Sequence, residues 1–589
     1  MEEPLIKKLS IYLGQYKKLI YIIPILVLLD VVCELSMPLL MARIIDIGIP
    51  GKDIQYIFSI GLVMILLALG AITFGIINMR LTTQASMGFG ANLRNALFEK
   101  VLTFSFKNID RYSTSSLITR LTNDANNLQT TLMMMLRILI RMPLMLVIAF
   151  ILAFSINARL SMILAVAIPL LSIGIFIIMK QATSRFSIMQ SKIDAVNNTL
   201  QENLIGIRVV KSYVREDHEI AKFKKANDDL TNAGIRAVTI AIINMPVMMF
   251  VMNGATLAII WMGGQMVYFG ALGAGELISF LSYVIQILMS VMMIAMVILM
   301  SARAEASGKR IVEVLDTRID ILDNEQSQEK VLENTAQSAA GKVEFKNVSF
   351  KYNLEGSGED VLSDISFTAM PGQVIGLVGG TGTGKSTLIH LIPRLYDVTA
   401  GQILVDGVDV RNYKLDDLRD KIGMVMQKNT LFSGTIRQNI AWGNPQATEE
   451  EIMSACKDAQ AHDFITKFPN GYDTELGQGG VNVSGGQKQR LCIARAMLKR
   501  PAILILDDST SAVDSGTEAK IRESFYNNFA HTTVFIIAQR ISSIKDADQI
   551  IVLDDGKIAG IGSHQELLVN NPIYQEINSS QQEGAYIHG

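Results

Sequence analysis

The sequence predicts an all-α domain of six membrane-spanning helices with long cytoplasmic helical extensions, followed by an α/β domain. Three observations support this division. Apolar and methionine-rich runs dominate the chain as far as about residue 340, alternating strand and helix patterns with glycine-rich turns dominate it thereafter, and a polar stretch lies between them. We therefore expect a membrane domain at 1–316, a linker at 317–341 and a second domain at 342–589.

The composition excludes several classes of protein. The chain has 589 residues, of which 50% are hydrophobic and 18% charged, and this is too apolar for a soluble protein of that length. A net charge of -2 gives no basic field, so we expect no nucleic acid as a partner. The three cysteines, Cys33, Cys456 and Cys492, lie far apart without the spacing of metal ligands, which disfavours disulfide scaffolds and zinc sites.

Six apolar segments are long enough to cross a lipid bilayer, since a helical span needs about 20 consecutive apolar residues. They are separated by three short connections and two long ones. We expect the six spans at approximately 19–45, 57–79, 132–155, 160–180, 239–263 and 274–300.

The connections differ in charge as well as in length. Those near Gly48, Asn157 and Gly270 are nearly free of Lys and Arg, whereas the two long ones, after spans two and four, are rich in both. By the positive-inside rule, the long connections and both termini lie in the cytoplasm of a multi-pass protein of the cell membrane. The long connections lack proline, so we expect them to be helical, with tips near 111–117 and 208–213 that contact the domain below.

A glycine-rich segment in the second domain follows the strand-like run 373–378 and precedes a helical run. A strand, such a loop and a helix in this order form a phosphate-binding loop, in which backbone N–H groups surround phosphate oxygens. Lys385 would place a positive charge on the outer phosphates, and Ser386 would offer a hydroxyl ligand to Mg²⁺. The loop consists of Gly379, Gly380, Thr381, Gly382, Thr383, Gly384, Lys385, Ser386 and Thr387.

Two further segments complement this loop. The apolar run 502–506 ends in Asp507, as expected of a buried strand that presents a carboxylate to Mg²⁺. A second helix opens with a serine and two glycines, and a helix start of this kind binds anions through its free N–H groups and its positive dipole end. That start comprises Val483, Ser484, Gly485, Gly486 and Gln487, so the chain has two separate phosphate-binding surfaces.

With these motifs the chain resembles the ATP-binding cassette (ABC) family, as a half-transporter of its exporter branch. The segment VSGGQ at 483–487 is close to the family's signature LSGGQ, and six spans precede the cassette over nearly the whole chain. The resemblance implies an α/β P-loop ATP-binding cassette fold with ATP and Mg²⁺ as cofactors. It also implies that two cassettes stack head to tail, so that each ATP lies between one chain's loop and the other's signature helix.

The same resemblance assigns roles to residues outside the loop. Tyr352 would stack on adenine, Gln427 would contact the γ-phosphate and Mg²⁺, and Asp514 would lie in the D-loop at the dimer seam. Each residue alone is a weak signal. Their order and spacing relative to the loop support the assignment.

Two residues at the expected hydrolytic site depart from the family pattern. Members that hydrolyse ATP efficiently place Glu directly after the magnesium Asp and His at the end of the next strand, where this chain has Asp508 and Gln539. The shorter Asp withdraws its carboxylate by about 1 Å from the attacking water, and such a misplacement can cost roughly 10²-fold in rate. Glutamine donates a hydrogen bond but cannot exchange a proton as imidazole does. We therefore expect this chain's own site to bind ATP and hydrolyse it slowly.

The intact signature helix serves the partner's nucleotide rather than this chain's own. A homodimer would then have two slow sites, whereas a heterodimer could combine this signature with a partner's Glu and His. We therefore favour a second ABC half-transporter chain as partner, as in bacterial heterodimeric multidrug exporters with one degenerate site. The alternative is that Asp508 and Gln539 are tolerated in a slow homodimer.

Candidate substrate residues lie on the predicted spans. Asp30 and Glu34 are one turn apart on span one, and a charge at mid-membrane costs about 2.5–3.5 kcal/mol, so such residues face a wet cavity or a partner. Met289 and Met293 share one face of span six, and methionine surfaces adapt to varied apolar ligands. The alternatives are structural pairing for the acids, and lipid contact or helix packing for the methionines.

The sequence as a whole predicts ATP-driven export of hydrophobic or cationic amphipathic small molecules, of the multidrug type, across a lipid bilayer. Export of lipid or peptide is the closer alternative. A non-transporting regulator or an ATP-gated channel subunit is the more distant one.

Overall fold

The structure is a computed structural model that describes residues 4–323, 341–352, 360–509 and 512–587. It divides into two compact units. Unit 1 comprises 1–102 and 113–317, and unit 2 comprises 103–112 and 318–589.

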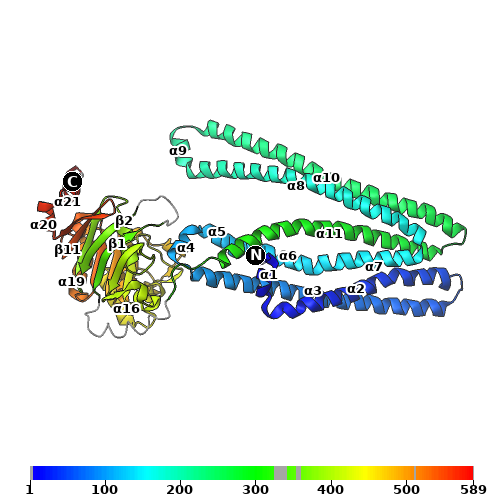
Figure 1. The fold of residues 1–589 in the computed structure, drawn as a ribbon, viewed down its shortest axis with the longest axis horizontal. Coiled ribbons are helices and arrows are strands. Elements are labelled where there is room, and N and C mark those ends of the chain that lie inside the picture. The colour runs from blue at the N-terminus through cyan, green and yellow to red at the C-terminus, as the bar shows by residue number, and fades with distance from the viewer. Residues whose placement is uncertain (1–3, 324–340, 353–359, 510–511, 588–589) are drawn as a thin grey trace. The chain divides into compact units, whose positions relative to one another are not determined.

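In its described part, unit 1 consists of helices joined by turns and has no strand, and six of its helical segments are long and apolar enough to cross a membrane. Helices α8 and α10 lie side by side along much of their length, α2 packs on α3, and α11 packs on α7 and α2 (Figure 1). Three π-helical turns (η2, η3 and η4) interrupt the α-helical hydrogen-bonding pattern. The elements are α1 (Leu5–Ser10), η1 (Ile11–Tyr16), α2 (Lys17–Arg43), η2 (Ile44–Gly48), α3 (Ile54–Leu102), α5 (Thr114–Thr119), η3 (Arg120–Asp124), α6 (Ala125–Met134), η4 (Met135–Leu139), α7 (Ile140–Ile156), α8 (Ala158–Ile205), α9 (Ile207–Ser212), α10 (Glu216–Tyr268) and α11 (Ala274–Leu315).

The two expected tips of the long connections differ in their surroundings. The first is the short helix α4 (Phe106–Arg111), which begins with a Ser105 and Asn108 capping box and belongs to unit 2. It therefore starts a few residues before the predicted 111–117. The second tip, α9, has no buried residue.

In its described residues, unit 2 contains two large sheets, a small two-stranded sheet of β7 and β8, and helices. One large sheet has the order β2-β1-β4-β5, and the other has the order β12-β11-β3-β10-β9-β6, which is parallel apart from the β11-β12 pair. The strands are β1 (Val343–Phe350), β2 (Leu362–Ala369), β3 (Val374–Gly379), β4 (Ala400–Val405), β5 (Val408–Asp409), β6 (Ile422–Val425), β7 (Gly434–Thr435), β8 (Glu475–Leu476), β9 (Ile503–Asp507), β10 (Thr533–Ile537), β11 (Gln549–Asp554) and β12 (Lys557–Gly562). The α-helices that follow β3 are α13 (Lys385–Leu391), α14 (Leu415–Asp420), α15 (Ile436–Ala441), α16 (Glu449–Asp458), α17 (His462–Ile465), α18 (Gly485–Leu498), α19 (Ser515–Asn528), α20 (His564–Asn570) and α21 (Pro572–Ile587).

The first residues of the predicted linker are fastened to unit 2, while 324–340 lie outside the described residues. Asn108 of α4 donates to the Arg318 carbonyl at 3.1 Å. Asp323 accepts a hydrogen bond of 2.8 Å from the backbone of Leu415, the first residue of α14, and so acts as a helix cap from a distant segment. The stretch from Arg318 to Asp323 is thus part of the domain surface rather than a free tether.

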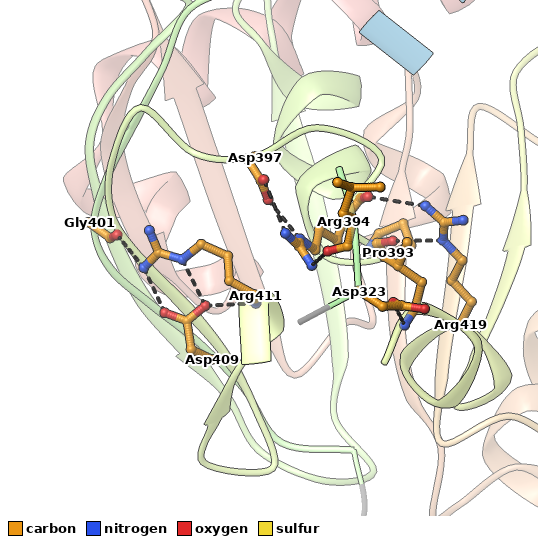
Figure 2. A network of polar contacts seen from close by, with 10 residues as sticks. Asp323, Pro393, Arg394, Asp397, Gly401, Asp409, Arg411 and Arg419 are labelled. Atoms are coloured by element: carbon orange, nitrogen blue, oxygen red, sulfur yellow. Dashed lines mark hydrogen bonds and ion pairs between the residues drawn. The ribbon is translucent and has the colours of Figure 1, made fainter. Parts of the chain in front are cut away.

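Figure 2 shows the arginines that surround this attachment. Arg419 donates to the carbonyl oxygens of Pro393 and Arg394 at 3.3 and 3.2 Å. Arg394 is buried, has a left-handed φ of 51°, and pairs with Asp397 at 2.8 Å. Because its neighbours fix both its backbone and its side chain, the turn after α13 is held in one conformation.

The parallel strands bring the sequence motifs to one edge of the sheet. Strand β10 lies between β3 and β9, and Ile537 is in register with Leu377 on one side and with Asp507 on the other. The carboxyl ends of adjacent parallel strands form the usual ligand-binding edge of such a sheet. The phosphate loop, Asp508 and Gln539 therefore emerge next to one another although far apart in sequence.

Candidate active site

The phosphate loop has the backbone that its glycines predict. Gly384 has a φ of 89° at the start of α13, and a Cβ there would approach Leu362 to 2.8 Å. A Cβ on Gly379 would lie 2.2 Å from the Leu553 carbonyl oxygen, whereas one on Gly382 would meet nothing within 4 Å. The loop is thus packed against the sheet at its base and open at its tip, where phosphate oxygens would lie.

Lys385 lies within this loop rather than on its surface. Its Nζ donates to the carbonyl oxygens of Gly379 and Gly380, at 3.0 and 2.5 Å. Burial lowers the pKa of the Lys385 ammonium, while the carboxylates of Asp507 and Asp508 act in the opposite direction. Thr383 also donates to the Gly380 carbonyl, at 3.0 Å. The Lys385 ammonium is therefore held by the backbone carbonyls of the first two residues of the loop.

The residues predicted to hold Mg²⁺ are brought together. Ser386 Oγ donates to Asp507 Oδ1 at 3.0 Å, and Asp507 is buried at the end of β9. A hydroxyl and a carboxylate in contact form an oxygen ligand set that suits Mg²⁺. Gln427 is exposed and hydrogen-bonds the Asp508 side chain. His390, which the sequence analysis did not single out, has its Nε2 3.5 Å from Asp507 Oδ2.

The two departures from the family pattern touch each other. Gln539 Nε2 donates to Asp508 Oδ2 at 2.6 Å. Asp508 has a left-handed φ of 47°, a conformation that Asp adopts more readily than most residues. Burial raises the pKa of the Asp508 carboxyl, and Asp507 acts in the same direction, whereas the hydrogen bonds from Gln539 and Gln427 lower it. The residue that follows the proposed Mg²⁺ ligand Asp507 is therefore held in a hydrogen bond with Gln539.

Tyr352, the predicted adenine contact, is 40% exposed and packs edge-on against Tyr396, with ring centroids 5.2 Å apart. Its hydroxyl lies 2.9 Å from Thr387 Oγ1, which ties it to the helix after the phosphate loop. Tyr396 in turn packs against Phe106 and donates to Asp110 Oδ2 at 2.6 Å, both on α4. Burial raises the pKa of the Tyr396 hydroxyl, which keeps it a donor. A continuous set of contacts thus joins α4 to the phosphate-loop helix.

The signature residues form a capping box at the start of α18. Gln487 N donates to Ser484 Oγ at 3.3 Å, and Ser484 N donates to Gln487 Oε1 at 2.9 Å. A Cβ on Gly486 would lie 2.7 Å from the Ala512 carbonyl oxygen, so only glycine fits there, and Gly485 lies beside it. Asp514 caps the next helix, α19, by accepting from Thr517 N at 2.9 Å.

In the membrane unit, the structure pairs the two acids with a residue that the sequence analysis did not name. Arg141 Nη1 lies 2.8 Å from Asp30 Oδ2, and its Nη2 contacts Glu34. Asp30 is buried, and this is the structural pairing that the sequence left open. Met289 is 47% exposed and Met293 is half-buried. A role of these four residues in substrate binding stays a prediction.

Family models, related sequences and a solved structure all show similarity to ABC transporters. The family model of the ABC transporter transmembrane region matches residues 20–291, and that of the ABC transporter matches 362–511. An uncharacterized ABC transporter ATP-binding protein, YfiB of Bacillus subtilis (strain 168), is 40% identical over 97% of this chain and 97% of its own length. The solved structure of a bacterial Atm1-family ABC exporter with ATP bound matches with a TM-score of 0.77 and 26% identity, over 96% of this chain and 99% of that chain.

Other relatives carry more specific names. A putative multidrug export ATP-binding/permease protein, YgaD of Bacillus subtilis (strain 168), is 33% identical over 98% of this chain and 99% of its own length. An ATP-dependent lipid A-core flippase of Syntrophus aciditrophicus (strain SB) is 35% identical over 83% of this chain and 80% of its own length.

Proposed function

The chain belongs to the ATP-binding cassette transporter family as an exporter half-transporter, and we propose that its own site holds ATP but hydrolyses it slowly. Exporters of this family act as dimers in a lipid bilayer and couple ATP hydrolysis to transport. In the dimer proposed here, the signature helix of this chain completes the active site of a different partner chain. The slow homodimer is the alternative.

The hydrogen bond between Asp508 and Gln539 is the observation that carries this proposal. A residue in the Asp508 position must orient the attacking water and accept its proton. In this chain, one carboxylate oxygen of Asp508 already accepts a 2.6 Å hydrogen bond from the Gln539 amide. The Asp side chain is also shorter than Glu, so its carboxylate would lie farther from a water beside the γ-phosphate. The amide of Gln539 has no titratable proton to exchange. We therefore expect this site to bind ATP without hydrolysing it efficiently.

The residues for binding are in place and support retention of ATP. The loop N–H groups and Lys385 would hold the phosphates, Ser386, Gln427 and Asp507 would hold Mg²⁺, and Tyr352 would support the base. When bound, Mg²⁺ neutralises charge on the phosphate oxygens. The hydrogen bond between Ser386 and Asp507 supports a Mg²⁺ site here, because it brings two oxygen ligands of suitable chemistry together.

The coupling we propose follows from this asymmetry. ATP at two interfacial sites draws the cassettes together, and the cytoplasmic helix tips, including α4, transmit the closure to the membrane domain. ATP at this chain's own site acts as a clamp, and hydrolysis at the site completed by Ser484 and its neighbours resets the exporter. Both termini and the long connections lie in the cytoplasm in this proposal.

For the substrate we propose an amphipathic small molecule of the multidrug type. Exposed Met289 and half-buried Met293, which share one face of α11, support an apolar ligand. Relatives are named for multidrug export and as a lipid A-core flippase. A lipid substrate remains the alternative. With Asp30 and Glu34 both paired to Arg141, a cationic ligand would have to compete with an existing ion pair.

The test replaces Asp508 and Gln539 with the Glu and His of the family pattern. Asp508→Glu together with Gln539→His should raise the ATPase activity of the lone, full-length chain by about 100-fold. Lys385→Ala added to that double variant is the control, and it should abolish the gain. A lone wild-type chain that hydrolyses ATP as fast as the double variant would contradict the proposal and favour the homodimer.

A further inference from the structure

The C-terminal helix α21 touches the segment that carries Gln539. The side-chain amide of Gln581 makes two hydrogen bonds to it: its Oε1 accepts from Ile541 N at 2.9 Å, and its Nε2 donates to the Gln539 carbonyl at 2.8 Å. The amide therefore pairs with the backbone on both sides of Arg540, much as a neighbouring strand would. One side chain thus holds the backbone at two points just after β10.

Gln581 occupies a position where the helix pattern calls for an apolar residue. Tyr574, Ile577 and Gln581 are spaced by three and four residues and share one face of α21. Tyr574 is fully buried, with its hydroxyl 2.7 Å from His564 Nδ1, and Ile577 packs on the core of the domain. These two contacts anchor the helix. The polar residue one turn later is then available to hold the adjacent backbone.

The bonds of Gln581 lead directly to the nucleotide site. The Gln539 backbone is held by Gln581, its side chain donates to Asp508, and Asp508 also bonds Gln427. Asp508 follows Asp507, which contacts Ser386 of the phosphate loop. Hydrogen bonds that run from Gln581 through Gln539 to Asp508 thus connect the C-terminal helix to the proposed Mg²⁺ ligands.

We propose that Gln581 is a positioning residue for this chain's own nucleotide site. It holds Gln539 against Asp508 and so prolongs the time for which ATP stays bound there. The inference rests on the proposed function, because a long-lived ATP complex is what a clamp requires. The residue acts through the backbone of 539–541 and not by contact with nucleotide.

The test measures the lifetime of bound ATP in the full-length chain in lipid nanodiscs with Mg²⁺. Gln581→Leu keeps the size of the side chain and removes both hydrogen bonds, and it should shorten the ATP dissociation half-time about 10-fold. Gln581→Glu retains an acceptor for Ile541 N but cannot donate to the Gln539 carbonyl, and it should shorten that half-time about threefold. Gln582→Leu, at the next and exposed position, is the matched control and should behave as wild type.

Two further readouts separate the possible failures. Amide hydrogen exchange at Ile541 should become faster in Gln581→Leu and stay unchanged in Gln582→Leu. Faster exchange with an unchanged ATP half-time would show that Gln581 only fastens the helix, and would overturn the inference. The recovered nucleotide is analysed as well: ADP formed rapidly at this site would refute the proposed slow hydrolysis, whatever the half-times are.

Discussion

The two phosphate-binding surfaces of this chain differ in which of their residues depart from the family pattern. At the phosphate loop, the binding residues are in place, but the two positions that assist hydrolysis are Asp508 and Gln539, bonded to each other at 2.6 Å. At the signature helix, Ser484 and Gln487 form a complete capping box, and Gly486 fits closely under the Ala512 carbonyl. We propose that the substitutions at Asp508 and Gln539 affect cleavage of this chain's own nucleotide, and that the signature helix still serves the nucleotide of another chain.

This difference indicates which constraint acts on each surface. A capping box and a tightly packed glycine stabilise the start of the helix, so the same residues serve both folding and the proposed role in a partner's site. The pair Asp508 and Gln539 has no comparable folding task. Substitution there can alter the chemistry of one site and leave the domain intact.

The largest effect should come from a negative charge at the signature helix. Ser484→Asp keeps a good N-cap residue, so α18 should fold normally. Its carboxylate would face the partner's ATP phosphates, and we expect the ATPase activity of the exporter assembled with its partner to fall at least about 100-fold. Ser484→Asn, which caps equally well without charge, is the control, and comparable loss in both variants would mean that the hydroxyl itself is what matters.

A smaller effect should come from the phosphate loop. Lys385→Ala removes the cation that lies against the Gly379 and Gly380 carbonyls, so this chain's own site should lose most of its ATP affinity. Because that site is proposed to act as a clamp, the assembled exporter should lose only about 3- to 10-fold in ATPase activity. Nucleotide binding and steady-state turnover are measured on the same preparation. A loss as large as that of Ser484→Asp would remove the functional distinction between the two surfaces.

The sequence predicts those parts of the site that depend on local order along the chain. The phosphate loop follows from a strand, glycines and a helix, and Asp507 follows from an apolar run that ends in an acid. Each of these signals is complete within about ten residues. The six membrane-length helices are predictable for the same reason, because hydropathy is a local property.

Long-range partners could not be predicted in this way. Arg141 lies more than 100 positions after Asp30 and Glu34, and nothing in the helical pattern says which face of α7 meets α2. Gln581 and Asp110 likewise gain their roles only when distant backbone or rings approach them. A polar residue on an apolar face, as at Gln581, was the one available signal. Such a residue indicates that its side chain has a hydrogen-bonding partner, but it does not identify that partner.

The smallest effect concerns stability rather than turnover. Asp508 has a raised pKa in the folded chain, so its ionised form costs stability above that pKa, and the cost disappears as the pH falls below the unfolded value of about 4. Asn at this position has no charge, can still accept from Gln539, and suits a left-handed φ. Asp508→Asn should therefore raise the nucleotide-free thermal midpoint by about 1 to 2 °C at neutral pH. Unfolding measured between pH 4 and pH 8 should show that advantage shrinking as the pH falls, and an advantage that grows toward acid would show that the carboxylate stabilises the fold.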